Sequence, residues 1–388
     1  MVSGMSFRIP ALPLAGLVAC TAGVSLGYGQ MAPTASVTDL KQLSIEQLMN
    51  TEVTSVSLYP EKLQQTASAV QVVTNADMVE SGAETIPEAL RLADNLDVAE
   101  KNPHDYAISA RGFNSNVGDK LLVLIDGRTV YTPIFSGVFW SSQDYLLQDL
   151  DRIEVISGPG GSIYGANAVN GVINIISKSA AETQGAYLET GVGTDLQQML
   201  GVRYGGTLTP DISYRAYVKY IGRGDDELST GIYTPDSWSQ TQAGFRIDAK
   251  SSVDNALTLQ GDIYSGALNE AGVGLARLEG ENLLGRWTHA GADGSNLSLQ
   301  VYYDRTYLDE PFPASPFAGA GLLRDALATY DVQLQDELTS FVPSCICPTA
   351  SPLIRPCAGW ARLRTMMLVL RWSMSPVTSN STRGWLGA

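Results

Sequence analysis

From about residue 185 to residue 340, hydrophobic and polar residues alternate along the chain. In the clearest segment, one side of an extended chain carries Ile212, Tyr214, Ala216, Val218 and Tyr220, and the other carries Ser213, Arg215, Tyr217 and Lys219. Comparable alternation occurs at residues 186–193, 200–206, 243–249, 257–264, 283–289, 297–304 and 328–335. A period of two residues predicts β-strands with one apolar and one polar face. Residues 183–340 are therefore predicted to form about eight antiparallel strands, each roughly ten residues long.

Residues 67–182 have a different pattern, typical of a compact α+β domain. Short apolar runs predict strands at residues 69–74, 121–125, 152–157 and 172–176. A first short helix is predicted over residues 76–81, with Asn75 as its N-cap and Gly82 as its stop. The sequence Thr-Ile-Pro-Glu at residues 85–88 matches a capping box, which predicts a second helix running to about residue 93.

The first 30 residues have the features of a secretory signal peptide. Arg8 supplies the positive charge, and residues 9–24 form the apolar segment. Residues 17–20 also match a lipoprotein cleavage box, with Cys20 as the acylated residue, but we expect Cys20 to be an apolar residue of the signal. Past this segment no run of about 18 apolar residues predicts a membrane-spanning helix. Secretion and strand length favour a transmembrane β-barrel over a soluble sandwich with one wet face.

Composition narrows the chemistry that the chain can perform. The formal net charge of -15 disfavours a nucleic-acid partner. No cysteine lies between residues 21 and 344, and His104 and His289 are the two histidines of the chain. These counts argue against a disulfide scaffold, a cysteine or multi-histidine metal site, and a histidine-based catalytic triad. We therefore expect neither enzymatic activity nor a cofactor.

Residues 149–178 contain two β-type runs joined by a glycine-rich loop. The loop does not match a dinucleotide fingerprint, because its third glycine position is Ile163 and no long helix follows. Instead, the sequence RIEVISGPGGSIYGANAVNGVINIISK resembles the end of the plug domain of TonB-dependent outer-membrane receptors. Three upstream segments resemble the same family in the same order: VQVVTNADMVESG at residues 70–82, ARGFN at residues 110–114 and LLVLIDGRTVY at residues 121–131.

This resemblance implies a plug at residues 67–182, followed by the first part of a barrel of about 22 strands in the bacterial outer membrane. It implies uptake of a scarce ligand, driven by a TonB-type energising protein, with outer-membrane lipid around the barrel. The implied ligand is a metal chelate, first of all a ferric siderophore. Vitamin B12, another metal chelate or an oligosaccharide are the alternatives, and so is a passive surface-binding protein of the same fold.

Within residues 31–66, the predicted periplasmic tether, the segment Glu52, Val53, Thr54, Ser55, Val56 and Ser57 alternates like an exposed strand. By resemblance it is a candidate TonB box, which binds by adding a strand to its partner. The residues that match the family's plug motifs are Arg111, Gly112, Phe113, Asp126, Gly127, Arg128, Gly158, Pro159 and Gly160. The family usually has arginine where this chain has Ser157, which puts one plug–barrel contact in doubt.

Three predicted loops of the plug supply the candidate ligand-binding residues: His104, Asn114, Asn116, Tyr131, Phe135, Phe139 and Trp140. Aromatic side chains bind flat organic chelates by stacking and dispersion. The alternative for these aromatic residues is ordinary packing between plug and barrel, and a lone histidine such as His104 is more often a surface residue.

Residues 341–388 depart from the alternating pattern. No Asp or Glu follows Glu337, whereas Cys, Pro, Trp and Arg become frequent. Proline at this density predicts that the tail does not form regular strands. Eight strands would also be too few to enclose the predicted plug. These features predict an incomplete receptor whose tail is disordered or translated out of frame.

Overall fold

The computed structural model describes residues 52–53, 61–62, 68–110, 112, 114–115, 120–132, 136–160, 164–165, 167–291, 295–312, 321–341, 362–374 and 377–379. All of these residues belong to one compact unit that begins at Ser44. No helix in these ranges is long and apolar enough to cross a membrane.

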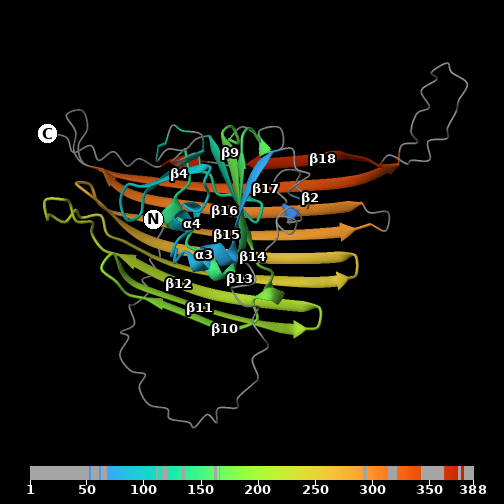
Figure 1. Cartoon of the computed structure of the whole chain (residues 1–388), viewed down its shortest axis with the longest axis horizontal. Coiled ribbons are helices and arrows are strands. Elements are labelled where there is room, and N and C mark those ends of the chain that lie inside the picture. Colours follow the sequence, from blue (N-terminus) through green and yellow to red (C-terminus); the bar gives the residue numbers. More distant parts are fainter. Residues whose placement is uncertain are drawn as a thin grey trace, which may run out of the picture. The chain divides into compact units, whose positions relative to one another are not determined.

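The second half of the chain forms one large antiparallel sheet (Figure 1). Its strands are β10 (Gly185–Gly191), β11 (Leu196–Thr209), β12 (Ile212–Arg223), β13 (Trp238–Ser252), β14 (Asn255–Glu270), β15 (Gly274–Ala290), β16 (Asn296–Phe312), β17 (Gly321–Phe341), β18 (Arg362–Met374) and β19 (Val377–Ser379). Each strand from β10 to β17 pairs with the next, and β19 also pairs with β17. The eight strands predicted for residues 183–340 are confirmed as β10–β17. From β11 onward they are longer than predicted, at 12 to 21 residues.

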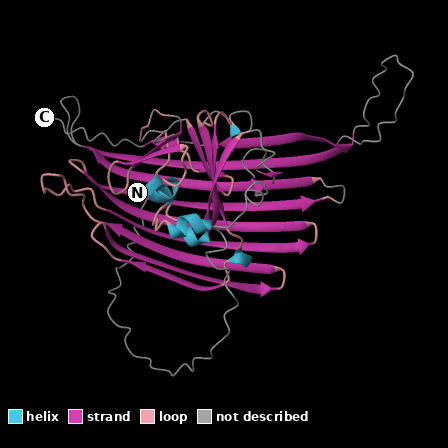
Figure 2. Ribbon diagram, viewed as in Figure 1, coloured by secondary structure: helices cyan, strands magenta, loops and turns pink. Residues whose placement is uncertain are grey.

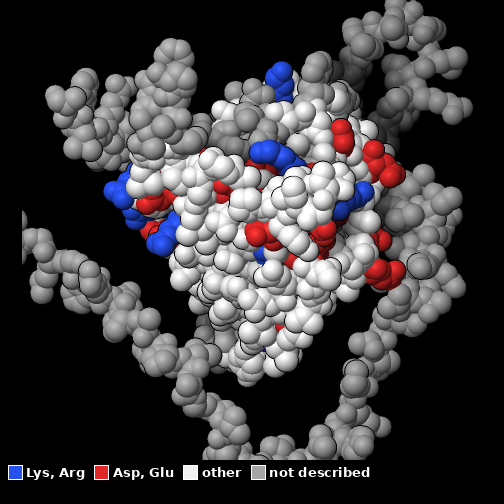
Figure 3. All heavy atoms as spheres, turned by 90° about the vertical axis from the view of Figure 1, so that its left-hand side faces the viewer, with Lys and Arg blue, Asp and Glu red and all other residues white. Residues whose placement is uncertain are grey.

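The two faces of the sheet differ as the alternation predicts. In β12 the side chains of Arg215, Tyr217 and Lys219 are buried, whereas Val218 between them is 49% exposed. The exposed apolar side chains of the other strands include Val202, Leu259, Ile263, Leu283, Val301 and Val332. In Figure 3 charged side chains gather in the upper half of the view, and the lower half is largely uncharged. The polar face of β12 is therefore the covered one, and the apolar face is open, as in a strand that faces lipid.

The α+β domain predicted from the first half of the chain lies against the polar face (Figure 2). Its main sheet has the order β3 (Ala69–Thr74), β8 (Leu150–Ser157), β9 (Gly171–Ser177), β6 (Leu121–Ile125) and β7 (Arg128–Thr129), with β6 and β9 parallel. A hairpin of β4 (Leu96–Glu100) and β5 (Tyr106–Ala110), which was not predicted, forms a second sheet. Short helices are α3 (Asn75–Glu80) and α4 (Ile86–Leu90), with 3-10 turns η2 (Trp140–Ser142), η3 (Leu147–Asp149) and η4 (Ala180–Glu182). Met78, Ile86, Leu90, Ile153, Ile173 and Ile175 are among the buried residues of its core.

The starts of both helices differ from the prediction. Thr74, not Asn75, caps α3 in a capping box with Asp77. The Asn75 side chain instead donates hydrogen bonds to the carbonyls of Leu147 and Leu150, at 2.9 and 2.8 Å. Thr85 makes no capping hydrogen bond at the start of α4. Asn75 is a residue type suited to capping a helix, but its side chain binds the carbonyls of Leu147 and Leu150 instead, so it does not cap α3.

The prediction that residues 341–388 form no regular strand is wrong for residues 362–374. These residues form β18, which pairs antiparallel with β17. The prolines on which the prediction rested lie outside the strand, at residues 343, 348, 352, 356 and 376. Proline excludes pairing where it stands, and it does not prevent a strand between two proline-containing segments.

Candidate functional site

The tip of the β4–β5 hairpin holds His104 in a fixed position. The side-chain oxygen of Asn102 accepts hydrogen bonds from the backbone N–H groups of His104 and Asp105, at 3.1 and 2.7 Å. Such local bonds from Asn side chains stabilise tight turns. The His104 side chain is fully buried, and its Nε2 lies 3.1 Å from the carbonyl oxygen of Asn269 at the end of β14. The turn thus places a histidine of the small domain against the large sheet.

A second loop, between β7 and η2, brings aromatic side chains to the same place. Phe139 is half-buried and packs beside apolar residues of the large sheet, while Trp140 is 8% exposed and belongs to the core of the small domain. The hydroxyl of Ser142 donates a 2.7 Å hydrogen bond to the Phe139 carbonyl, which fixes the turn at η2. One loop therefore presents two neighbouring rings, of which Phe139 is the more accessible.

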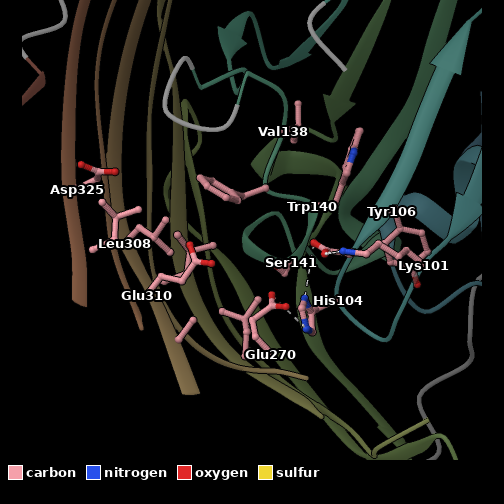
Figure 4. A pocket seen from close by; sticks show the side chains of 16 residues that line it. Lys101, His104, Tyr106, Val138, Trp140, Ser141, Glu270, Leu308, Glu310 and Asp325 are labelled. Atoms are coloured by element: carbon pink, nitrogen blue, oxygen red, sulfur yellow. Dashed lines mark hydrogen bonds and ion pairs between the residues drawn. The ribbon is translucent and has the colours of Figure 1, made fainter. Parts of the chain in front are cut away.

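These two loops and the strand ends enclose a pocket of about 290 Å³ (Figure 4). The small domain contributes Lys101, His104, Asp105, Tyr106, Val138, Phe139, Trp140 and Ser141, and strands β14–β17 contribute Leu268, Glu270, Ala276, Leu278, Leu308, Glu310, Leu323 and Asp325. The pocket combines an aromatic and aliphatic wall with charged groups from both parts, which is the usual composition of a small-molecule site.

Carboxylates dominate the charge around His104. Asp105 Oδ1 lies 3.7 Å from His104 Nδ1, and Glu270 Oε1 lies 3.8 Å from His104 Nε2. Burial opposes the charged imidazole, but the nearby carboxylates of Asp105 and Glu270 and the hydrogen bond with Asn269 outweigh it, so the pKa of His104 is raised above its usual value. The pKa of Asp105 is lowered: burial opposes its charge, and His104 and Lys101 outweigh that effect.

The candidate ligand residues fall into three groups. His104, Phe139 and Trp140 line the pocket. Asn114 and Tyr131 do not line it, and the Asn114 side chain donates a long hydrogen bond, at 3.4 Å, to the Asp97 carbonyl. Asn116 and Phe135 lie outside the described residues. Sequence reasoning missed the acidic strand residues Glu270, Glu310 and Asp325, because nothing in a strand's alternation shows what lies opposite its end.

Asp126 and Gly127 form the tight turn between β6 and β7, and Arg128 is the first residue of β7. Asp126 and Gly127 have positive φ angles, of 50° and 79°, which glycine and aspartate tolerate. The Asp126 carboxylate accepts hydrogen bonds from the backbone and hydroxyl of Ser177, at 2.9 and 2.7 Å, and from Gln260 of β14, at 2.9 Å. The turn is thus a contact between the small domain and the sheet.

Other plug-motif positions have structural roles or are not described. Gly112 and Gly158 have positive φ angles, and a side chain at Gly160 would lie 2.9 Å from Val172. Pro159 is the residue directly before Gly160. Arg111 and Phe113 lie outside the described residues. Ser157, where the resembling family has arginine, accepts a 2.6 Å hydrogen bond from Asn95 within the small domain.

Charged groups that the sequence did not single out form several ion pairs between domain and sheet. Arg203 of β11 binds Asp149, and Lys219 of β12 donates to Asp144 at 2.7 Å. Arg223, at the end of β12, contacts Glu84, Glu88 and Glu100. Their position on the polar face of the strands could have indicated that they form ion pairs, since a charge on a covered face requires a partner.

Acid is expected to weaken the contact that Asp126 makes. Its pKa is lowered because the charge of Arg246 and the hydrogen bonds from Ser177 and Gln260 outweigh the cost of burial. A depressed pKa contributes stability above the unfolded value of about 3.9, and this contribution is lost as the pH falls through the folded pKa. Urea unfolding of the chain in detergent, followed by tryptophan fluorescence between pH 7 and pH 3, should show the loss. Asp126→Asn should be less sensitive to acid, and superimposable profiles for both proteins would contradict this role.

Part of the candidate TonB box lies in the described residues. Glu52 and Val53 form β1, which pairs antiparallel with β2 (Glu61–Lys62), and Val53 is fully buried. Thr54, Ser55, Val56 and Ser57 lie outside the described residues. The extended conformation predicted at the start of the segment is therefore present, but one of its edges is already paired.

Comparisons with known proteins agree with this architecture. Residues 62–172 match the family model of the TonB-dependent receptor plug domain. The vitamin B12 transporter BtuB of Vibrio vulnificus is 29% identical over 154 residues, which is 39% of this chain and 24% of that protein. The BtuB of Vibrio cholerae serotype O1 (strain O395) is 30% identical over 161 residues, 41% of this chain and 26% of that protein. The alignments thus span about a quarter of the curated relatives' length.

Solved structures share the fold at low sequence identity. The FpvAI–pyocin S2 complex has a TM-score of 0.59 at 16% identity, covering 76% of this chain and 43% of that chain. The ferric enterobactin receptor PfeA of Pseudomonas aeruginosa has a TM-score of 0.57 at 15% identity, covering 72% and 47%. The plug match, the similar sequences and the shared fold agree: residues 62–172 match the plug domain of TonB-dependent receptors, and the chain is similar to such receptors over a plug domain and part of the barrel.

Proposed function

We propose that this chain provides the plug and the first barrel strands of a receptor for active uptake of a scarce metal chelate, and that the pocket around His104 and Phe139 binds it. The pocket itself carries the proposal: rings from a plug loop and charged groups from plug and barrel converge on one cavity of about 290 Å³. Relatives named as a B12 transporter and as siderophore receptors support a metal chelate as the ligand class.

The position of the pocket along the strands supports access from outside the cell. Between β10 and β17, connections at the pocket end include residues 224–237 and 313–320. The pocket end also carries the short connections 192–195 and 271–273, whereas all three connections at the opposite end are short, at residues 210–211, 253–254 and 291–295. Outer-membrane barrels have short periplasmic turns and longer extracellular loops. The pocket would then meet ligand before the rest of the plug does.

The charge of the pocket favours a neutral or cationic chelate. Four carboxylates, from Asp105, Glu270, Glu310 and Asp325, line the pocket together with Lys101 and His104. Like charges in a partly enclosed site repel an anion. A neutral ferric hydroxamate or a corrinoid such as vitamin B12 therefore fits better than a strongly anionic ferric catecholate. The charge of the pocket does not distinguish a neutral siderophore from vitamin B12.

A binding experiment tests the site. Isothermal titration of the detergent-solubilised chain with cyanocobalamin, a ferric hydroxamate and a ferric catecholate should show binding of a neutral chelate and none of the catecholate. Phe139→Ala should weaken that binding by about tenfold, because it removes a stacking surface of the pocket. Phe245→Ala, which removes an exposed ring of β13, is the matched control and should leave affinity unchanged. Equal affinities in both variants would remove Phe139 from the site.

Deletion of residues 52–57 distinguishes active transport from passive binding. If this segment adds a strand to a TonB-type protein, its deletion should abolish uptake of the bound chelate into cells and leave chelate affinity intact. Undiminished uptake by the deletion variant would contradict active transport through this segment. The uptake assay uses a receptor in which this chain is completed by further barrel strands, because the strands present here are too few to enclose the plug. Binding with no uptake by that receptor would instead favour the passive surface-binding alternative.

A further inference from the structure

Three side chains at the base of the pocket come from both parts of the protein and meet at one point. His104 and Asp105 stand on the β4–β5 hairpin of the plug, and Glu270 is the last residue of β14. One ligand atom from each lies within 4.8 Å of the other two. Figure 4 shows the side chains of His104 and Glu270 directed toward each other. An imidazole and two carboxylates are a donor set used by proteins for divalent transition metals.

The hydrogen bond made by His104 leaves one ring nitrogen free for a further interaction. A carbonyl oxygen can only accept, so the 3.1 Å contact of Nε2 with the Asn269 carbonyl places the proton of the neutral ring on Nε2. Nδ1 is buried and makes no hydrogen bond. A histidine whose second nitrogen donates to a backbone carbonyl is the usual arrangement of a metal ligand, because that bond fixes the tautomer and the ring orientation.

Asp105 and Glu270 each present an oxygen to the imidazole, Asp105 Oδ1 at 3.7 Å from Nδ1 and Glu270 Oε1 at 3.8 Å from Nε2. Asp105 forms its ion pair with Lys101 through Oδ2, at 3.1 Å, and its Oδ1 faces His104. The Lys101 side chain is 56% exposed. Glu270 is 27% exposed and reaches the site from the barrel side. The remaining direction opens into the pocket, which Glu310 and Asp325 also line.

We propose that His104, Asp105 and Glu270 bind a divalent transition-metal ion that joins the plug to β14 and keeps an open coordination position toward the pocket. Metal–ligand distances of about 2.0–2.2 Å require the three groups, now within 4.8 Å of one another, to close by up to roughly an ångström, and Glu270 Oε1 to move from the Nε2 side of the ring toward Nδ1. The proposal does not depend on the chelate receptor function, because it concerns a metal ion supplied alone.

The competing explanation is an imidazolium held between two carboxylates with no metal. It would give the same three side chains the same neighbours, so the experiment must detect the ion itself. The chain offers a direct control, since His289 is its second histidine and lies on β15, hydrogen-bonded to Asn255.

The test is a titration of the detergent-solubilised 388-residue chain with Co²⁺ salt, followed by visible absorption, with Zn²⁺ in competition. We expect saturable binding of one Co²⁺ that Zn²⁺ displaces and Ca²⁺ does not, since imidazole selects transition metals over Ca²⁺. His104→Gln and Glu270→Gln should each weaken binding by at least about tenfold. His289→Gln and Glu281→Gln, which change the other histidine and an exposed carboxylate of β15 outside the pocket, should bind as the unaltered chain does.

A second measurement keeps the proposal testable if a ligand variant fails to fold. In the His289→Gln variant loaded with Cu²⁺, electron paramagnetic resonance should show coupling to one imidazole nitrogen, which can only be that of His104. Absence of a saturable Co²⁺ signal, absence of imidazole coupling, or unchanged affinity in folded His104→Gln would overturn the proposal. Metal binding without chelate binding would support the metal site and contradict the chelate receptor function.

Discussion

Asp144→Ala is expected to lower the free energy of unfolding of the chain by about 3–5 kcal/mol, because it leaves a buried ammonium group without its counter-ion. Lys219 is fully buried between β12 and the plug, and its Nζ donates to Asp144 Oδ1 at 2.7 Å. Its two other partners, the carbonyls of Glu84 and Tyr145 at 2.8 and 3.2 Å, carry no net charge. Urea unfolding in detergent, followed by tryptophan fluorescence, measures the loss.

Two controls separate the loss of the partner from the loss of a carboxylate. Asp211→Ala removes an exposed aspartate at the β11–β12 turn and should change stability by no more than about 0.5 kcal/mol. The double variant Asp144→Leu with Lys219→Met removes both charges and should be close to neutral. Burial raises the pKa of Asp144 despite the attraction of Lys219, which agrees with a pair whose desolvation offsets its Coulomb energy. A double variant as unstable as Asp144→Ala would contradict this account.

The sequence predicted the elements whose signals are local. Strands β3 and β6 were predicted with their observed bounds, because each is a short apolar run between polar or turn residues. The number of strands from residue 183 to residue 340 followed from alternation alone. Strand lengths did not, because the strands run on past their apolar segments through polar residues such as those at the end of β14, which meet the plug loops.

The candidate site could be predicted only in part, for a physical reason. His104, Phe139 and Trp140 lie on plug loops, and family resemblance located those loops. Glu270 is far from His104 in the sequence, and their contact depends on the register of the barrel strands against the plug. Similarly, alternation placed Lys219 on the covered face of β12, but no sequence pattern identified Asp144 as its partner. Local patterns fix which face a residue occupies, and tertiary packing fixes what it meets.

Arg128→Leu is expected to destabilise the contact between plug and barrel, by about 3–5 kcal/mol. The Arg128 guanidinium binds Asp304 of β16 and lies 3.1 Å from the Tyr145 hydroxyl. Tyr145 in turn donates to Asp262 of β14, at 2.8 Å. Arg128 is buried, so its removal leaves the carboxylate of Asp304 in a covered site without a counter-ion. Leu replaces much of the aliphatic volume, so the change is mainly one of charge.

The position of Arg128 also predicts where the damage appears. The residue follows the turn at Asp126 and Gly127, so losing its contacts should loosen β6 and β7 from the sheet before the sheet itself unfolds. Hydrogen exchange should therefore rise in residues 121–132 of Arg128→Leu and remain low in β12 and β13. Arg305→Leu is the matched control, because Arg305 is 51% exposed and its 3.7 Å ion pair with Glu281 contributes at most about 1 kcal/mol. If both variants lose the same stability, or if exchange in Arg128→Leu rises uniformly, the Arg128–Asp304 pair does not hold the plug in the barrel.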